Sequence, residues 1–161
     1  MVNEQSFKRA LYAYKDRLNR WKKNIKGTRF NKEQNVTIKF VVPLFNMLGW
    51  NPFTEDMEFE YYIRGKSKKG RNVDIALLPE IPKILVEVEP IQNKLEHGIR
   101  QIFKHYLRNS KSSFGIVTNG WQLNLYHKYK QRHHTVNLTP LFAFRTIDDL
   151  IDYRDVLWLL S

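Results

Sequence analysis

Three acidic residues stand in two short apolar stretches that follow each other closely along the chain. Asp74 lies within 72–78, and Glu87 and Glu89 lie within 84–90. Short stretches that are rich in Val, Ile and Leu and bounded by Gly or Pro are typical of buried or half-buried strands. Because side chains alternate along a strand, Glu87 and Glu89 should project from the same face. The link between the two stretches is short enough for a hairpin, which would bring Asp74 beside that pair.

Carboxylates on apolar strands need a compensating cation, because burial of an unpaired charge is costly. A divalent metal ion is the simplest compensator, and converging carboxylates are the hard oxygen ligands that suit Mg²⁺ or Mn²⁺. The alternative is a set of strand-edge carboxylates that face solvent, and the apolar neighbours of each residue argue against it. We therefore expect a metal site at Asp74, Glu87 and Glu89.

Composition limits the class of protein. The 161 residues predict one domain, 1–161, that is long enough to bury a core. The absence of cysteine excludes disulfides, zinc–thiolate sites and cysteine nucleophiles. No apolar run reaches the length of a membrane span and no signal-peptide pattern opens the chain, so we expect a cytoplasmic protein with no membrane partner. Phosphate-loop and nucleophile-elbow motifs are also absent.

The formal net charge is +11, a value typical of nucleic-acid-binding domains, although a well-solvated surface would also account for it. Basic residues gather immediately ahead of Asp74. A phosphodiester substrate requires this arrangement, because cations hold the backbone while carboxylates hold a metal at the scissile phosphate. We therefore expect DNA as a partner, with contacts from Arg64, Lys66, Lys68, Lys69, Arg71 and Lys104.

Hydrophobic periodicity predicts four helices. A basic helix within 1–26 carries an apolar stripe that could dock on the domain, pair with a second copy as a homodimer, or both. A second helix is expected from Asn31, as its N-cap, to Leu48, with strain at Pro43 and Gly49 just after its end. The other two are expected over 93–109 and 146–160.

Strands are expected over 58–64, 72–78, 84–89, 113–118 and 121–126, with an extended segment within 136–144. Asn119-Gly120 is a strong hairpin signal between two of them. The order of elements predicts a mixed central sheet flanked by helices, an α/β (α+β) fold.

The ordered set of motifs resembles a known family. Asp74 and the Glu87-Val88-Glu89 triplet are followed by a helix that bears Gln101 and by the segment 115–120. With the leading helix and the segment 42–50, they resemble the PD-(D/E)xK nuclease superfamily, specifically the N-terminal nuclease domain of type I restriction enzyme R subunits. The resemblance covers roughly residues 7–127. It implies a restriction-endonuclease-like fold, metal-assisted hydrolysis of DNA phosphodiesters, and restriction–modification subunits as candidate partners.

The resemblance also implies roles for individual residues. Asp74 and Glu87 would bind Mg²⁺ or Mn²⁺ together with the carbonyl of Val88, and Glu60 or Glu33 would complete or support the site. A solvated strand face accounts equally well for Glu60, and the helix dipole alone favours an acid at Glu33.

Gln101 would orient its helix or contact the DNA backbone. The family motif at this point is only partly kept, because Tyr106 follows Gln101 at five residues rather than four and His105 takes the expected position. Full R subunits carry an ATP-driven translocase after the nuclease domain, so this chain would act independently or with partners.

Glu89 departs from the family pattern, which has a lysine here to position the attacking water and offset charge at phosphorus. Two outcomes are open. Glu89 serves as a further metal ligand or general base, or the chain is a catalytically inactive DNA-binding or partner-binding module of the same fold. A lysine could also come from Lys83, Lys94 or Lys104, of which Lys104 lies one helical turn from Gln101.

Two other residue types bear on a site. Tyr61 and Tyr62 lie near the basic residues and could contact nucleic acid, although we expect at least one of them to pack in the core. The histidines lack the HxxxH or HExxH spacing of metal ligands, so none is expected to bind metal.

Overall fold

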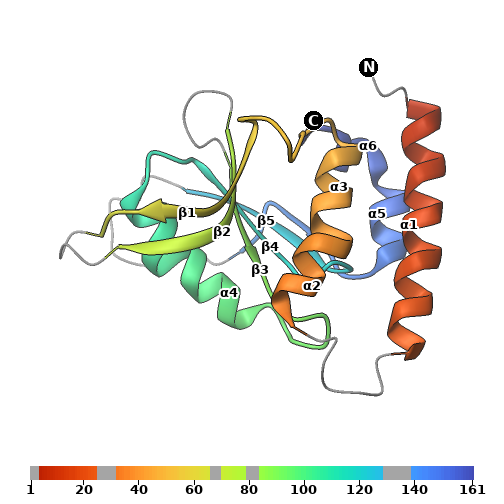
Figure 1. Ribbon diagram of the computed structural model, residues 1–161, viewed down its shortest axis with the longest axis horizontal. Helices are drawn as coiled ribbons and strands as arrows, with labels where there is room; N and C mark the ends of the chain where they lie inside the picture. The colour runs from red at the N-terminus through yellow and green to blue at the C-terminus, as the bar shows by residue number, and fades with distance from the viewer. Residues whose placement is uncertain (1–3, 25–31, 66–69, 79–83, 129–138) are drawn as a thin grey trace.

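A central sheet organises the molecule, which we describe from a computed structural model (Figure 1). The structure describes residues 4–24, 32–65, 70–78, 84–128 and 139–161. Within these ranges, six strands form one sheet in sequence order. β3 and β4 are parallel, and the other neighbouring pairs are antiparallel. The strands are β1 (Met57–Ile63), β2 (Arg71–Leu77), β3 (Ile84–Val88), β4 (Phe114–Thr118), β5 (Leu123–His127) and β6 (Phe142–Phe144).

The predicted strands are confirmed, with ends shifted by one or two residues. The Asn119-Gly120 turn joins β4 to β5, and Gly120 adopts a φ of 90°, which favours glycine. β6 forms the end of the predicted segment 136–144, whose first part lies outside the described residues. The mixed sheet flanked by helices is therefore confirmed.

Helices cover both faces of the sheet (Figure 1). α4 (Glu96–Gln101) continues as a π-helical segment η2 (Ile102–Tyr106) and a 3₁₀ segment η3 (Leu107–Asn109), and these cover one face. The other side holds α1 (Glu4–Asn24), α2 (Glu33–Val36), the π-helical segment η1 (Thr37–Val41), α3 (Val42–Met47), α5 (Ile147–Asp152) and α6 (Arg154–Trp158). Among the described residues, no helix is long and apolar enough to cross a bilayer.

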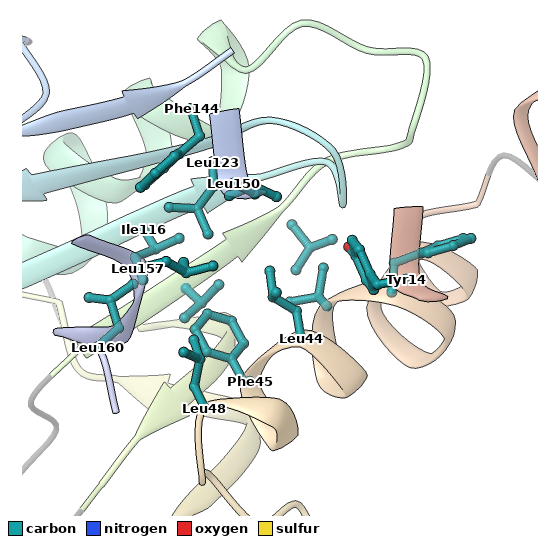
Figure 2. Close-up of a cluster of buried hydrophobic side chains, with 14 of the residues drawn as sticks. Tyr14, Leu44, Phe45, Leu48, Ile116, Leu123, Phe144, Leu150, Leu157 and Leu160 are labelled. Atoms are coloured by element: carbon teal, nitrogen blue, oxygen red, sulfur yellow. The ribbon is translucent and has the colours of Figure 1, made fainter. Parts of the chain in front are cut away.

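Two apolar clusters fill the space between these layers. The larger lies between the sheet and the side that carries α1, α3, α5 and α6. Figure 2 shows part of it, with Tyr14, Leu44, Phe45, Leu48, Ile116, Leu123, Phe144, Leu150, Leu157 and Leu160. The smaller cluster lies beneath α4 and η2, where Ile102 and Tyr106 pack with Leu85 and Val117 of the sheet.

The apolar stripe of α1 docks on the chain's own core, as one of the two sequence interpretations predicts. Its buried residues are Phe7, Leu11, Tyr14 and Leu18. The Tyr14 hydroxyl donates to the carbonyl of Gly120, and Lys15 pairs with Asp148 at the start of α5. These contacts fix α1 to the β4–β5 turn and to the C-terminal helices.

The second predicted helix is confirmed in position but differs in form. Lys32 stands at its N-cap position and makes no side-chain cap, and Asn31, the predicted N-cap, lies outside the described residues. A π-helical turn, Thr37–Val41, interrupts it just before Pro43. Proline has no N–H to donate to the carbonyl four residues earlier, and its ring crowds that carbonyl. A wider turn gives the ring more room and lets the carbonyl accept from the N–H five residues later. Gly49 ends the helix with a φ of 98°, and the Trp50 N–H closes the turn on the Phe45 carbonyl at 3.0 Å.

Two other helix predictions need correction. The helix expected over 93–109 begins only at Glu96, because the preceding residues form a turn in which the Asn93 N–H donates to the Pro90 carbonyl. The helix expected over 146–160 is two short helices separated at Tyr153, where φ is −105° and ψ is 34°. Leu150 of α5 and Leu157 of α6 both lie in the larger cluster, so both short helices pack on the same core.

Candidate active site

Asp74 lies at the point where β2 and β3 separate. Their antiparallel register ends at the pair formed by Ile75 and Val86. Beyond this pair, the Val88 N–H donates to Asp74 Oδ2 at 2.6 Å. The side chain of Asp74 thus takes the place of a backbone acceptor and is held against β3.

Glu87 and Glu89 are buried on the face of β3 that α4 covers. Their exposed fractions are only 5% and 4%. A Cβ added at Gly98 of α4 would lie 3.0 Å from Glu89 Oε1 and 3.3 Å from Glu87 Cγ, so glycine lets the helix approach both side chains closely. Continuing the β2–β3 register places Asp74 opposite Glu87, and side chains opposite each other share a face. The structure therefore brings together the three acidic residues that the sequence singles out.

Glu60 faces the same region from β1 and has strained backbone. Among the described residues it is the one non-glycine with a positive φ, 52°. It falls between the pairs Phe59–Ile75 and Tyr61–Val73, opposite Asp74. The left-handed conformation costs a non-glycine residue about 1–2 kcal/mol, and such strain is often concentrated at functional sites. The distortion at Glu60 therefore marks this point of the β1–β2 pair as a candidate site.

Glu33 reaches the site from the other layer. It is the first residue of α2, and its carboxyl group hydrogen-bonds with that of Asp74. The helix dipole favours an acid at this position, but the contact with Asp74 also places Glu33 in the acidic group. Five carboxyl groups, from Glu33, Glu60, Asp74, Glu87 and Glu89, thus interact in one region.

Burial and mutual repulsion raise the pKa values of carboxyl groups in the acidic group. The pKa of Asp74 is raised from 3.8 to about 7, chiefly by burial and also by the charges of Glu33 and Glu60, while the hydrogen bond from the Val88 N–H opposes the shift. Burial, followed by the charges of Asp74 and Glu33, raises the pKa of Glu87 from 4.5 to about 9. Burial likewise raises the pKa of Glu33. Without a cation, the site therefore retains protons at neutral pH.

The basic group that the structure places against Glu89 is a histidine. His97 Nδ1 lies 3.0 Å from Glu89 Oε1, and Gln101 Nε2 lies 3.3 Å from the same nitrogen. His97 and Gln101 are four residues apart on α4 and share a helix face. Sequence reasoning missed His97, because it looked for metal-binding pairs of histidines. A useful signal would have been its spacing to Gln101 and its position next to Gly98.

The lysines proposed to replace the motif lysine are not in contact with Glu89 where the structure describes them. Lys94 is exposed in the turn before α4. Lys104 and Arg71 are both exposed. Burial lowers the pKa of His105, and the charges of Arg71 and Lys104 lower it further. Arg64 is exposed at the end of β1. Lys66, Lys68, Lys69 and Lys83 lie outside the described residues.

Comparison with known proteins assigns this arrangement to a family. A family model described as the N terminus of the type I restriction enzyme R protein (HSDR_N) matches residues 32–141. The chain belongs to this family. The match includes every carboxylate of the acidic group as well as His97 and Gln101.

Two solved structures share the fold of this R-protein N-terminal domain. A cryoEM structure of a DrdV–DNA complex has a TM-score of 0.63 and 12% identity, over 95% of this chain and 14% of that one. A fragment described as an HsdR subunit of a type I restriction enzyme from Vibrio vulnificus YJ016 has a TM-score of 0.52 and 19% identity, over 75% of this chain and 25% of that one. The chain therefore spans a quarter or less of each neighbour's length. No curated protein matches the sequence.

The donor set of this family member suits a hard divalent cation, although it is not preassembled. Within the described ranges, no three His, Cys, Asp or Glu side chains already surround one point as a metal site. However, Glu87 Oε2 is buried without a hydrogen-bond partner, and an unpartnered buried oxygen is costly. Asp74 and Glu87 share a face next to this oxygen, so a cation there could satisfy it and offset the repulsion.

Proposed function

We propose that this domain is a metal-dependent DNA endonuclease of the PD-(D/E)xK type with a role in restriction or defence. The observation that carries the proposal is the pairing of Asp74 with Glu87 across the gap between β2 and β3, where Glu87 keeps a buried oxygen without a partner. A buried carboxyl pair with raised pKa values is typical of a site that acts on a substrate or binds a metal. Membership of the R-protein family supports the same reaction class.

Asp74 and Glu87 would hold Mg²⁺ or Mn²⁺ together with the carbonyl of Val88. When bound, the ion would polarise the scissile phosphate and lower the pKa of the attacking water. Glu60 and Glu33 lie beside these ligands and would support the site with further carboxylate oxygens. Deprotonation of the acidic group would then accompany metal binding.

Glu89 and His97 would together take over the task of the motif lysine. The Glu89 carboxylate is within hydrogen-bonding distance of His97, so the imidazole can orient it and compensate its charge. In this arrangement Glu89 would position the attacking water and accept its proton, or act as a further metal ligand. Gln101 lies beside His97 on α4 and would restrict the positions open to the imidazole.

Exposed cations near the acidic group would hold the DNA backbone. Arg71 opens β2 three residues before Asp74, and Lys104 lies close enough to share an effect on His105. Arg64 stands at the end of β1, and the sequence places Lys66, Lys68 and Lys69 in the segment that follows. Binding through such contacts should weaken steeply with salt.

A plasmid-nicking assay with Mg²⁺ and Mn²⁺ tests this function. We expect the wild-type chain to nick supercoiled DNA, and Asp74→Asn and Glu87→Gln to lose about a hundredfold or more of the rate while still binding DNA. The exposed Asp152 of α5 supplies a control, and Asp152→Asn should cut normally. If Asp74→Asn and Glu87→Gln cut at the wild-type rate, the assignment of the site is wrong.

The replacement of the motif lysine by Glu89 favours a second candidate, a DNA-binding or partner-binding module of the same fold that does not cut. This candidate predicts salt-sensitive DNA binding in a gel shift and no nicking with either metal ion. Nicking that requires Asp74 would exclude it.

A further inference from the structure

A groove opens beyond the acidic group, between the end of β1 and the loop that follows η3. Its volume is about 160 Å³, and it is lined by Tyr61–Arg64 and by Asn109–Lys111. A closed apolar cavity of about 150 Å³ can accept benzene, so the groove has the size for one aromatic ring. The residues that line it are mixed in type and include aromatic, cationic, polar and apolar residues.

Tyr62 presents an aromatic ring to solvent from this groove. Its exposed fraction is 56%, and a Cβ added at Gly70 would collide with the ring. Tyr62 pairs with Asn72 across β1 and β2, so Gly70 is its diagonal neighbour. The backbone of Gly70 therefore supports the ring from one side. Tyr61, in contrast, is half-buried and packs against the smaller cluster, as the sequence leads us to expect for one of the pair.

Cationic and hydrogen-bonding groups stand on both walls of the groove. Arg64 lies on the β1 wall and Lys111 on the opposite wall, and both are exposed. The hydroxyl oxygen of Ser110 is buried and has no hydrogen-bond partner within the described residues. The Lys128 Nζ donates to the Ser110 carbonyl at 2.9 Å, which fixes this wall to the end of β5. The groove thus combines an aromatic surface with positive charge.

The groove lies along the same strand as one of the acidic residues. Tyr62 follows Glu60 by two residues, which corresponds to about 7 Å along a strand. A nucleic-acid strand that crosses the acidic group could therefore place the next nucleotide over Tyr62.

We propose that this groove binds one unpaired nucleotide of the DNA strand next to the cleavage position, with its base stacked on Tyr62 and its phosphate held by Arg64 and Lys111. The proposal rests on the proposed function for its substrate class. Base–aromatic stacking tolerates any base, so the groove would select unpaired structure rather than sequence.

The test is binding of a short single-stranded oligonucleotide that carries one 2-aminopurine, measured with EDTA present so that cutting cannot interfere. Stacking quenches the fluorescence of 2-aminopurine, so we expect quenching with the wild-type chain and with Tyr62→Phe. Tyr62→Ala should lose the quenching and bind about tenfold more weakly. Tyr153→Ala is the matched control, because Tyr153 is 61% exposed and stands on the C-terminal helices. An otherwise identical oligonucleotide with an abasic position should bind the wild-type chain and Tyr62→Ala equally.

Quenching and affinity that are unchanged in Tyr62→Ala would overturn the proposal. An equal loss of affinity of Tyr62→Ala for the abasic oligonucleotide would also overturn it, because base stacking could not then be the cause of the loss. These results are independent of cleavage. A chain that never cuts can still pass the test, and a chain that cuts through Asp74 can still fail it.

Discussion

Glu89 Oε1 lies 3.0 Å from His97 Nδ1, so this buried carboxyl group has an imidazole partner on the neighbouring helix α4. Glu89 is almost fully buried, whereas the side chain of His97 is 73% exposed. The imidazole therefore forms the boundary between the acidic group and solvent. Gly98 makes this contact possible, because it lets the backbone of α4 approach the two glutamates.

Removal of His97 should reduce cleavage without unfolding the chain. We expect His97→Ala to lower the nicking rate about ten- to hundredfold, because Glu89 loses the group that orients it. DNA binding and thermal stability should change little, since the side chain is exposed. Arg100→Ala, an exposed change on the same helix, is the control for both readouts. A His97→Ala variant that nicks as fast as the wild type would remove His97 from the mechanism.

Substitution of Glu89 by lysine, the residue of the proposed PD-(D/E)xK motif, should not increase cleavage. Glu89→Lys would place a longer cation against His97 and against the close approach at Gly98. We expect loss of cleavage together with a destabilisation of roughly 1–3 kcal/mol from overpacking, measured by denaturant unfolding. Glu89→Gln keeps the shape and should retain stability. Increased cleavage by Glu89→Lys would instead indicate a decayed nuclease.

The acidic group should make the metal-free chain less stable as pH rises. The pKa of Asp74 rises from 3.8 in the unfolded chain to about 7 in the folded chain, and the pKa of Glu87 rises from 4.5 to about 9. The folded state therefore binds more protons than the unfolded state between about pH 4 and pH 9. Stability is then greatest at low pH and falls as pH rises from about 4 to 9. Thermal unfolding in EDTA should show this decline, and Glu87→Gln should flatten it and raise stability at pH 9 by about 1 kcal/mol or more. Equal pH profiles for the two proteins would contradict the buried carboxyl pair.

Substitutions of Glu60, which has a strained backbone, should affect stability and activity differently. Glycine adopts a positive φ without penalty, so Glu60→Gly should be more stable than Glu60→Ala by about 1 kcal/mol in thermal or denaturant unfolding. Both variants lose the carboxylate, so both should nick more slowly if Glu60 supports the site. A faster or unchanged nicking rate in both would assign the strain to the fold alone.

Much of the fold could be predicted because local signals agree with the tertiary structure. The alternation within the strands and the Asn119-Gly120 turn each have one good structural solution, whereas the stripe of α1 leaves docking and pairing open. Helix ends and irregular turns could not be predicted in the same way. The π-helical turn before Pro43 and the break at Tyr153 interrupt stretches whose hydrophobic periodicity is continuous, so periodicity alone does not locate them.

The part of the candidate site that lies on the strands could be predicted from the sequence. Strand alternation and a short link suffice to bring Asp74 beside Glu87 and Glu89. The contributions of Glu33 and His97 depend instead on how α2 and α4 approach the end of the sheet. Both residues lie at exposed helix positions; the family resemblance names Glu33 only as one of two candidates, and no sequence pattern singles out His97.

Direct binding of Mn²⁺ is the most immediate test of the central claim, that Asp74 and Glu87 form a metal site. Isothermal titration of the wild-type chain at pH 8, in two buffers with different ionisation enthalpies, should show saturable binding with release of protons. Glu87→Gln should bind at least about tenfold more weakly and release fewer protons, while Asp152→Asn should match the wild type. Equal Mn²⁺ affinity and equal proton release in Glu87→Gln and the wild type would contradict the account.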